Sequence, residues 1–153
     1  MITLELRPDL PVLALVSCVG RKVDGPVPAR ALYTSDWFLK ARALVEARGW
    51  PWRVLSAKHG LLRPEEPVER YDLTLKKMQR SDRQAWATRV LAQLNDELTE
   101  PHQLLVLAGD RYVEFLLTPL AGRGHLVVRP LEGLGIGQQL RALLDLHAAA
   151  TAN

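Results

Sequence analysis

Four stretches of the sequence gather side chains that can do chemistry, and the first is Ser17-Cys18-x-x-Arg21-Lys22. Nearby positive charge makes a thiol more reactive, so Cys18 is a candidate nucleophile beside Ser17. Arg21 and Lys22 are equally suited to a phosphate group, the first as a planar fork and the second as a point charge. Alternatively, Cys18 is a small residue that lines a site or fills the core, and a solvated basic turn follows it.

The second stretch is centred on Lys58 and His59, which follow an apolar run. Histidine can donate or accept a proton near neutral pH. Lys58 can bind phosphate, or pair with Asp72 after the long aperiodic segment 60–75, which also brings in Tyr71. Long loops of this kind are often functional. The structural alternative is a solvated Lys58 with His59 capping a turn. We favour the functional interpretation, with His59 and Asp72 as the pair that transfers protons.

The third stretch is a proline-rich loop over residues 25–35, which leads into a predicted helix. A helix N-terminus attracts anions through its free N–H groups and its dipole. Arg30 and Tyr33 are therefore expected to reach a bound anion. The alternative is a loop held by its prolines, with Tyr33 packed against the protein.

The fourth stretch is Gly133-x-Gly135-x-Gly137-Gln138, which precedes the last predicted helix. Backbone without side chains next to a helix N-terminus suits the close approach of a phosphate. A further segment, Gly109-Asp110-Arg111-Tyr112, begins a helix in which Asp110 is expected to act as the cap. Tyr112 is expected either to stack on a base or to pack in the core.

The elements that must position these stretches alternate along the chain. Short apolar runs predict buried strands, and patterns with helical spacing follow each of them. The predicted strands are Val12–Ser17, Trp52–Ser56, Leu104–Ala108 and Leu126–Arg129. The predicted helices begin after Thr34 or Ser35, after Ser81, at Arg111 and at Gln138. This order predicts an α/β fold with a four-stranded, mainly parallel sheet and helices on both faces. Ligands bind at the carboxyl ends of such strands, where the chemically active stretches begin.

Composition indicates a single compact domain over residues 1–153, with a core from about 12 to 147. Hydrophobic residues make up 48% of the chain and charged residues 24%, which is typical of globular proteins. No apolar run is long enough to span a membrane, and the first ten residues do not resemble a signal peptide. One cysteine fits a reducing compartment, so we expect a cytoplasmic protein. The oligomeric state stays open.

The charge is unevenly distributed. Residues 21–90 hold 15 Lys or Arg and 8 Asp or Glu, a net charge of +7, whereas the remainder holds 5 and 9, a net charge of −4. A basic half indicates an anionic partner, although a mildly basic surface is the simpler explanation. The four histidines are widely spread, and no motif for a metal or cofactor occurs, so none is expected.

Several motifs, in order, resemble DUF6884, an uncharacterised family of bacterial and phage domains. They are Ser17-Cys18-x-x-Arg21-Lys22, Pro28-Ala29-Arg30-x-Leu32-Tyr33-Thr34-Ser35-x-x-Phe38-x-Lys40-Ala41, Leu55-Ser56-Ala57-Lys58-His59-Gly60-Leu61, Tyr71-Asp72-Leu73 and Gly135-Ile136-Gly137-Gln138-Gln139-Leu140. The resemblance covers about residues 12–145. That family resembles, more distantly, the peroxide-stress protein YaaA family, which implies DNA binding and a role in oxidative stress. The cysteine and lysine after a strand are also similar to a domain of archaeosine synthase, from which no catalytic role is transferred.

These observations favour a nucleic-acid-associated protein of stress-response, phage-defence or base-modification type. It would bind a phosphate or nucleobase of DNA or RNA at the strand ends, without a membrane, and Tyr33 or Tyr71 would contact a base or sugar. One alternative is a transferase or hydrolase acting on a free nucleotide or nucleoside. The other is a non-catalytic interaction module. Whether the protein is an enzyme stays open.

Overall fold

The predicted apolar runs form the parallel part of one five-stranded sheet. The computed structural model describes residues 2–18 and 20–152. The strand order is β4-β3-β1-β6-β7, with β4 antiparallel to β3 and the other pairs parallel. The strands are β1 (Val12–Ser17), β3 (Trp52–Ser56), β4 (Gly60–Leu62), β6 (Gln103–Leu107) and β7 (Leu126–Val128). The central strand β1 is buried from its second residue onward, as expected for a strand covered on both faces.

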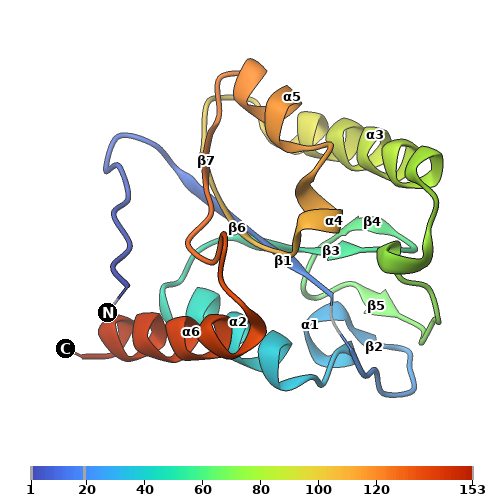
Figure 1. Cartoon of the computed structure of the whole chain (residues 1–153), viewed down its shortest axis with the longest axis horizontal. Coiled ribbons are helices and arrows are strands. Elements are labelled where there is room, and N and C mark those ends of the chain that lie inside the picture. The colour runs from blue at the N-terminus through green and yellow to red at the C-terminus, as the bar shows by residue number, and fades with distance from the viewer. Residues whose placement is uncertain (1, 19, 153) are drawn as a thin grey trace.

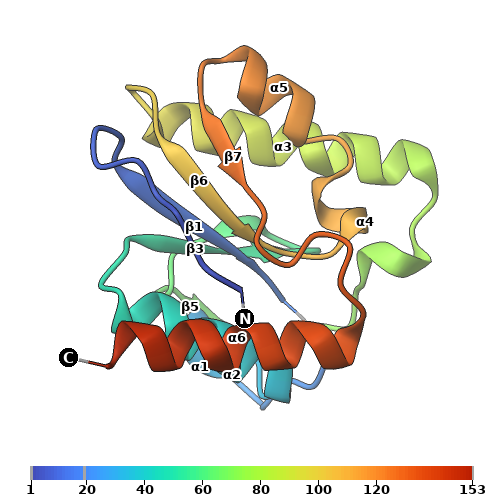
Figure 2. The same ribbon diagram turned by 60° about the vertical axis from the view of Figure 1, so that its left-hand side comes forward.

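Helices cover the two faces of the sheet, as the alternating sequence pattern predicted. On one face lie α2 (Asp36–Ala47) and α6 (Ile136–Ala150), which pack against each other. On the other face lie α3 (Arg80–Glu97), α4 (Asp110–Val113) and α5 (Leu117–Gly122). Figures 1 and 2 show the sheet between these two layers. None of the helices in the described part of the chain is long and apolar enough to cross a membrane.

The sheet has five strands where the sequence predicted four. The additional strand β4 lies at the start of the predicted loop 60–75, and Gly60, at a φ of +72°, reverses the chain into it. The same region contributes β5 (Pro67–Val68), which pairs with β2 (Val27–Pro28) in a separate ribbon. It ends in a short 3₁₀ helix, η1 (Leu75–Lys77). β2 and β5 have two residues each, and β4 has two apolar residues after its glycine, so none of them shows a hydrophobic period that the sequence pattern could detect.

Helix boundaries also differ from the predictions. Ser35 caps α2 as expected, because its side chain accepts the N–H of Phe38. The helix predicted to begin at Arg111 is instead divided into α4 and α5. Pro119 lies in the first turn of α5, where a missing N–H has little effect. A four-residue helix, α1 (Ala29–Leu32), precedes α2.

Candidate functional site

In the sheet, β3 lies on one side of β1 and β6 lies on the other. The order in which the chain adds strands therefore changes direction at β1. Open α/β sheets bind ligands beside such a switch point, at the carboxyl ends of the strands. A pocket of about 550 Å³ lies there. It is bounded by residues after β1, residues after β6, the first turn of α6 and the segment 72–76. The segments after β1 and β6 and the turn that leads into α6 therefore border one cavity, whereas the segment after β3 does not line it.

Gly20 shapes the exit from β1 into this pocket. Its φ is +76°, a conformation that favours glycine. A Cβ at this position would lie 2.9 Å from the Cβ of Ser35, the residue that caps α2. The close approach holds the segment after β1 against the start of α2.

Beside the pocket, all three tyrosines of the chain gather around its one cysteine. The hydroxyl of Tyr71 lies 2.7 Å from that of Tyr33, 2.7 Å from Ser56 Oγ and 3.5 Å from Cys18 Sγ. The hydroxyl of Tyr112 donates to the carbonyl oxygen of Cys18 at 3.1 Å and lies 3.4 Å from its sulfur. Both Cys18 and Tyr112 line the pocket. We call these five residues the tyrosine cluster.

The hydrogen bonds of the tyrosine cluster can all be satisfied with neutral groups. Ser56 Oγ accepts the backbone N–H of His59 at 3.1 Å, which leaves its own proton for Tyr71. Tyr71 can then donate to Cys18. Burial raises the pKa of Tyr71, and likewise that of Tyr33 and Tyr112, above the ordinary tyrosine value. At neutral pH these phenols are therefore hydrogen-bonding groups and not bases.

Ser17, the last residue of β1, differs from the cluster because its hydroxyl has no partner. The residue is 1% exposed, and its Oγ is the one buried side-chain oxygen or nitrogen in the described part of the chain without a hydrogen bond. A buried hydroxyl without a partner costs about 1–3 kcal/mol. Ser17 also lines the pocket. A polar ligand atom in the pocket would supply the missing partner.

Two lysines of the pocket have no ion pair with any residue that the structure describes. They are Lys22 and Lys76. The Nζ of Lys22 lies 4.8 Å from the ring centre of Tyr71, a cation–π distance. Arg111 also lines the pocket, but its guanidinium lies 3.6 Å from Glu114.

The acids of the pocket are Asp72 and Asp110. Asp110 pairs with Arg129 at 3.0 Å, and Arg129 also pairs with Glu132 at 3.2 Å. Asp72 is exposed and has no ion pair among the described residues. The lining therefore suits a ligand with an anionic part.

The structure separates Lys58 and His59 from the pocket. Lys58 is exposed, and neither residue lines the cavity. The ring of His59 lies edge-on to Tyr71, with the ring centres 5.5 Å apart. Burial, helped by Lys58 and Arg89, lowers the pKa of His59, which favours the neutral ring. No hydrogen bond or ion pair joins His59 or Lys58 to Asp72 within the described ranges, so the expected proton-transfer pair is not assembled.

Arg30 and Arg21 also lie outside the cavity lining. Arg30 binds both carboxylate oxygens of Glu46, at 2.9 and 3.1 Å, which occupies its planar fork. Arg21 is exposed, and its carbonyl oxygen accepts the N–H of Thr34 at 2.8 Å. Tyr33 lies in the tyrosine cluster, where its contacts are with protein groups.

The glycine-rich stretch contributes through residues other than those predicted. Gly135 caps α6, and its N–H donates to the side chain of Gln138 at 3.1 Å. Neither of them lines the pocket, and Gly137 does not either, whereas the neighbouring Ile136 and Gln139 do. The predicted turn borders the pocket, but the helix phase decides which of its side chains face the cavity.

Sequence reasoning missed the structural importance of Ser56, Trp37 and Gln139. Trp37 donates its indole N–H to Gln139 Oε1 at 2.9 Å, which joins α2 to α6 along one wall of the pocket. Ser56 ends β3 as Ser17 ends β1, and this repeated position was the available signal. Tyr112, predicted to stack on a base or to enter the core, is both buried and part of the pocket wall.

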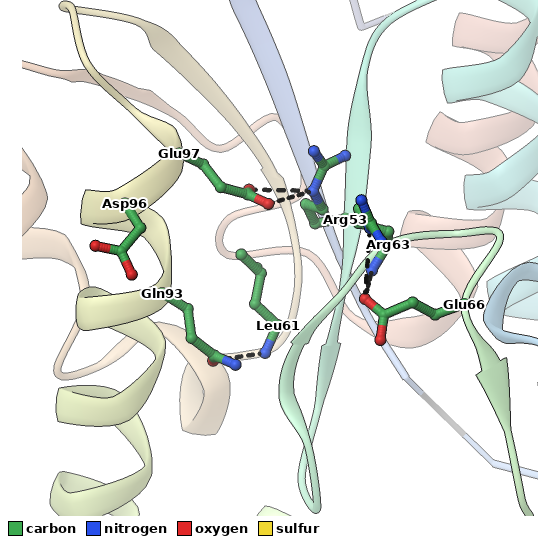
Figure 3. A pocket seen from close by; sticks show the side chains of 7 residues that line it. All are labelled: Arg53, Leu61, Arg63, Glu66, Gln93, Asp96 and Glu97. Carbon is green, nitrogen blue, oxygen red and sulfur yellow. Dashed lines mark hydrogen bonds and ion pairs between the residues drawn. The ribbon is translucent and has the colours of Figure 1, made fainter.

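A different hollow, of about 390 Å³, lies between β4 and α3 (Figure 3). Four of its five charged side chains form ion pairs: Arg53 lies 3.1 Å from Glu97, and Arg63 lies 3.7 Å from Glu66, while Asp96 has no ion pair among the described residues. Gln93 accepts the N–H of Leu61. Because both arginines already have partners and the remaining charge is negative, the pocket at the carboxyl ends is the better candidate site for an anionic ligand. Within residues 2–18 and 20–152, no group of three or more potential ligands could hold a metal ion.

A family model matches residues 13–145, and its description is a family of unknown function, DUF6884. The chain belongs to this family, which confirms that part of the expected resemblance. No curated protein matches the sequence significantly. The assignment names no reaction, so the interpretation of the site depends on its geometry.

Proposed function

We propose that this member of the DUF6884 family is a nucleic-acid-associated protein that holds one nucleotide in the pocket at the carboxyl ends of β1 and β6. One observation supports this most: within the described part of the chain, a pocket at the switch point of the sheet combines a buried hydroxyl without a hydrogen bond with two lysines without an ion pair. Its volume of about 550 Å³ is typical of small-ligand sites.

The chemistry of the walls suits a nucleotide. A nucleotide has a flat base with a polar edge and an anionic phosphate. Trp37, Leu73 and Ile136 provide apolar surface for the base, and Ser17 provides a hydrogen-bonding group for its edge. Lys22 and Lys76 provide positive charge for the phosphate.

The proposal gives Cys18 a place in the wall of the pocket. Its sulfur is within hydrogen-bonding distance of Tyr71 and Tyr112, and its side chain is buried. The tyrosine cluster then holds the end of β1 in a fixed position beside the ligand. A cytoplasmic location and a role in stress response, phage defence or base modification remain part of the proposal. The first rests on the single cysteine, and the second on the resemblance to the YaaA family.

Binding measurements with Lys22→Gln test the proposal. The probes are a mixture of nucleoside monophosphates and a short oligonucleotide of mixed sequence, each titrated at low and at moderate salt. We expect affinity to fall by roughly fivefold at low salt and the difference to shrink as salt rises. Arg48→Gln is the charge-matched control, because Arg48 stacks on Trp50 at the opposite end of α2.

Equal binding by the wild type and Lys22→Gln, under conditions where both are folded, would contradict the proposed phosphate site. Binding and turnover of a free nucleotide without affinity for the oligonucleotide would instead favour the transferase or hydrolase. If neither probe binds, the non-catalytic interaction module would be the remaining interpretation.

A further inference from the structure

A second, shallower hollow adjoins the pocket and shares one of its walls. Its volume is about 420 Å³, and Leu73 lines both cavities. Its floor is largely apolar and includes Met78 and Trp86. Leu73 is 41% exposed, so it forms a ridge that a ligand can cross from one hollow to the other. The two hollows are therefore neighbouring parts of one surface.

One cation lines this second hollow, and the backbone of another adjoins it. Arg89 is in the lining and donates to the backbone carbonyl oxygen of Lys58 at 2.8 Å, and Ala57, the residue before Lys58, lines the hollow as well. Arg89 and Lys58 are both exposed, and neither forms an ion pair within the described part of the chain. One acid, Asp82, is in the lining. The sequence had assigned Lys58 to the pocket, whereas the structure places it beside the second hollow.

We propose that a single strand of nucleic acid crosses the Leu73 ridge, with one nucleotide in the pocket and the adjoining phosphates held by Lys58 and Arg89. This inference rests on the proposed function and extends it to a polymeric ligand. Cations next to apolar surface match a strand, in which phosphates alternate with bases and sugars. The strand is single because a base that enters a pocket has left its pair and its stack.

Equilibrium binding to ligands of different length tests the inference. The probes are a mixed-sequence single-stranded DNA of about 12 nucleotides, the RNA of the same sequence, the corresponding DNA duplex and the mixture of nucleoside monophosphates. We expect both single strands to bind more tightly than the duplex and the monophosphates. The DNA and RNA arms show whether the 2′-hydroxyl contributes.

The double variant Lys58→Gln/Arg89→Gln isolates the second hollow. The slope of log affinity against log salt should decrease in magnitude by about 1.4 for the single strand, because each lost phosphate contact removes about 0.7. Affinity for the strand should fall by roughly fivefold for each lost contact at low salt. Binding of the monophosphates should not change, since neither residue lines the pocket.

Arg48→Gln/Arg123→Gln is the control with the same change in charge. These two arginines follow α2 and α5 and precede β3 and β7, so they lie at the opposite edge of the sheet. The control should bind the strand as the wild type does. Thermal unfolding of both double variants establishes that each is folded at the assay temperature.

Three results would overturn the inference: equal affinity for strand and monophosphates, equal losses in the two double variants, or preference for the duplex. In each case, continued binding of monophosphates that depends on Lys22 would leave the proposed pocket intact. Loss of that dependence would overturn the proposed function itself.

Discussion

The two edges of the sheet differ in whether a buried polar side chain forms hydrogen bonds with the protein. Gln103, at the amino end of β6, and Ser17, at the carboxyl end of β1, are each 1% exposed. The amide of Gln103 is well satisfied: it accepts the N–H of Arg7 at 2.9 Å and donates to the carbonyl oxygens of Arg7 and Leu10 at 2.6 and 2.7 Å. Ser17 has no such partner among the described residues.

Other polar and charged side chains show a similar difference between the two edges. On the amino side, Arg53 pairs with Glu97, and His125 Nδ1 accepts the N–H of His102 at 3.1 Å. On the carboxyl side, Lys22 and Lys76 have no ion pair within the described ranges. The buried amide of the amino edge is thus satisfied by the protein itself, whereas the carboxyl edge has a buried hydroxyl without a partner and two pocket lysines without an ion pair among the described residues. From this comparison we expect Gln103 to contribute to stability, and Ser17, Lys22 and Lys76 to contribute to the proposed binding.

The largest expected effect is at the amino edge of the sheet. Gln103→Leu leaves the backbone groups of Arg7 and Leu10 without their partner, so the free energy of unfolding should fall by about 3 kcal/mol. Urea denaturation measures this loss. Binding of nucleoside monophosphates to the folded fraction should stay at the wild-type level. A variant as stable as the wild type would contradict the comparison, because the hydrogen bonds of Gln103 would then not stabilise the amino edge.

A smaller loss is expected in the tyrosine cluster. Tyr71→Phe removes the hydroxyl that joins Tyr33, Ser56 and Cys18, and should cost about 2 kcal/mol. Tyr33→Phe is the matched control, because its hydroxyl has one hydrogen-bond partner, Tyr71. It should cost about half as much. Equal losses in urea denaturation would show that Tyr71 is not the central member of the cluster.

Two serines at neighbouring strand ends sharpen the contrast between stability and binding. Ser56→Ala removes a hydroxyl that contacts Tyr71 and the N–H of His59, and should destabilise the protein by about 1–2 kcal/mol. Ser17→Ala removes a hydroxyl without a partner. Its unfolding free energy should therefore remain unchanged or rise by up to about 1 kcal/mol, while nucleotide affinity decreases. A destabilised Ser17→Ala with normal affinity would place Ser17 among the structural residues.

The smallest effect is a pH dependence that both edges share. Burial lowers the pKa of His59 at the carboxyl edge and of His125 at the amino edge. The unfolded state, with an ordinary histidine pKa near about 6.5, then binds more protons than the folded state below that pH. The stability from each neutral histidine is present above that pH and decreases as the pH falls toward the lowered pKa.

Urea unfolding between about pH 7.5 and 5.5 tests this effect. His59→Gln and His125→Gln should each reduce the loss of stability on acidification. Because burial is the leading cause at both positions, added salt should preserve most of the effect. An unchanged pH profile in either variant would show that its histidine does not contribute.

The sequence predicted the strands and the edge at which the candidate site lies, because both follow from local pattern and from the rules of parallel sheets. The run Val12–Ser17 is continuous and apolar, and the structure has a strand with those bounds. By contrast, the partnership of Arg30 with Glu46 joins residues on α1 and α2. No local pattern carries information on such a pairing, so Arg30 was assigned to the site.

The same limit explains why Tyr112 and Ser56 were undervalued. Tyr112 is 94 positions from Cys18, which it contacts, and Ser56 is 15 positions from Tyr71. A hydroxyl that completes a buried cluster looks the same in sequence as one that faces water. Lys58 and His59 stood out because they are adjacent and chemically active, yet they do not line the pocket.

The position of the tyrosines gives the protein a set of natural reporters. Because all three belong to the cluster around Cys18, a signal selective for tyrosine arises there and nowhere else in the fold. Fluorine-labelled tyrosine would give three resonances, one from each side chain of the cluster. The spectrum of a single labelled amino acid would thus report ligand entry into the neighbouring pocket without any mutation.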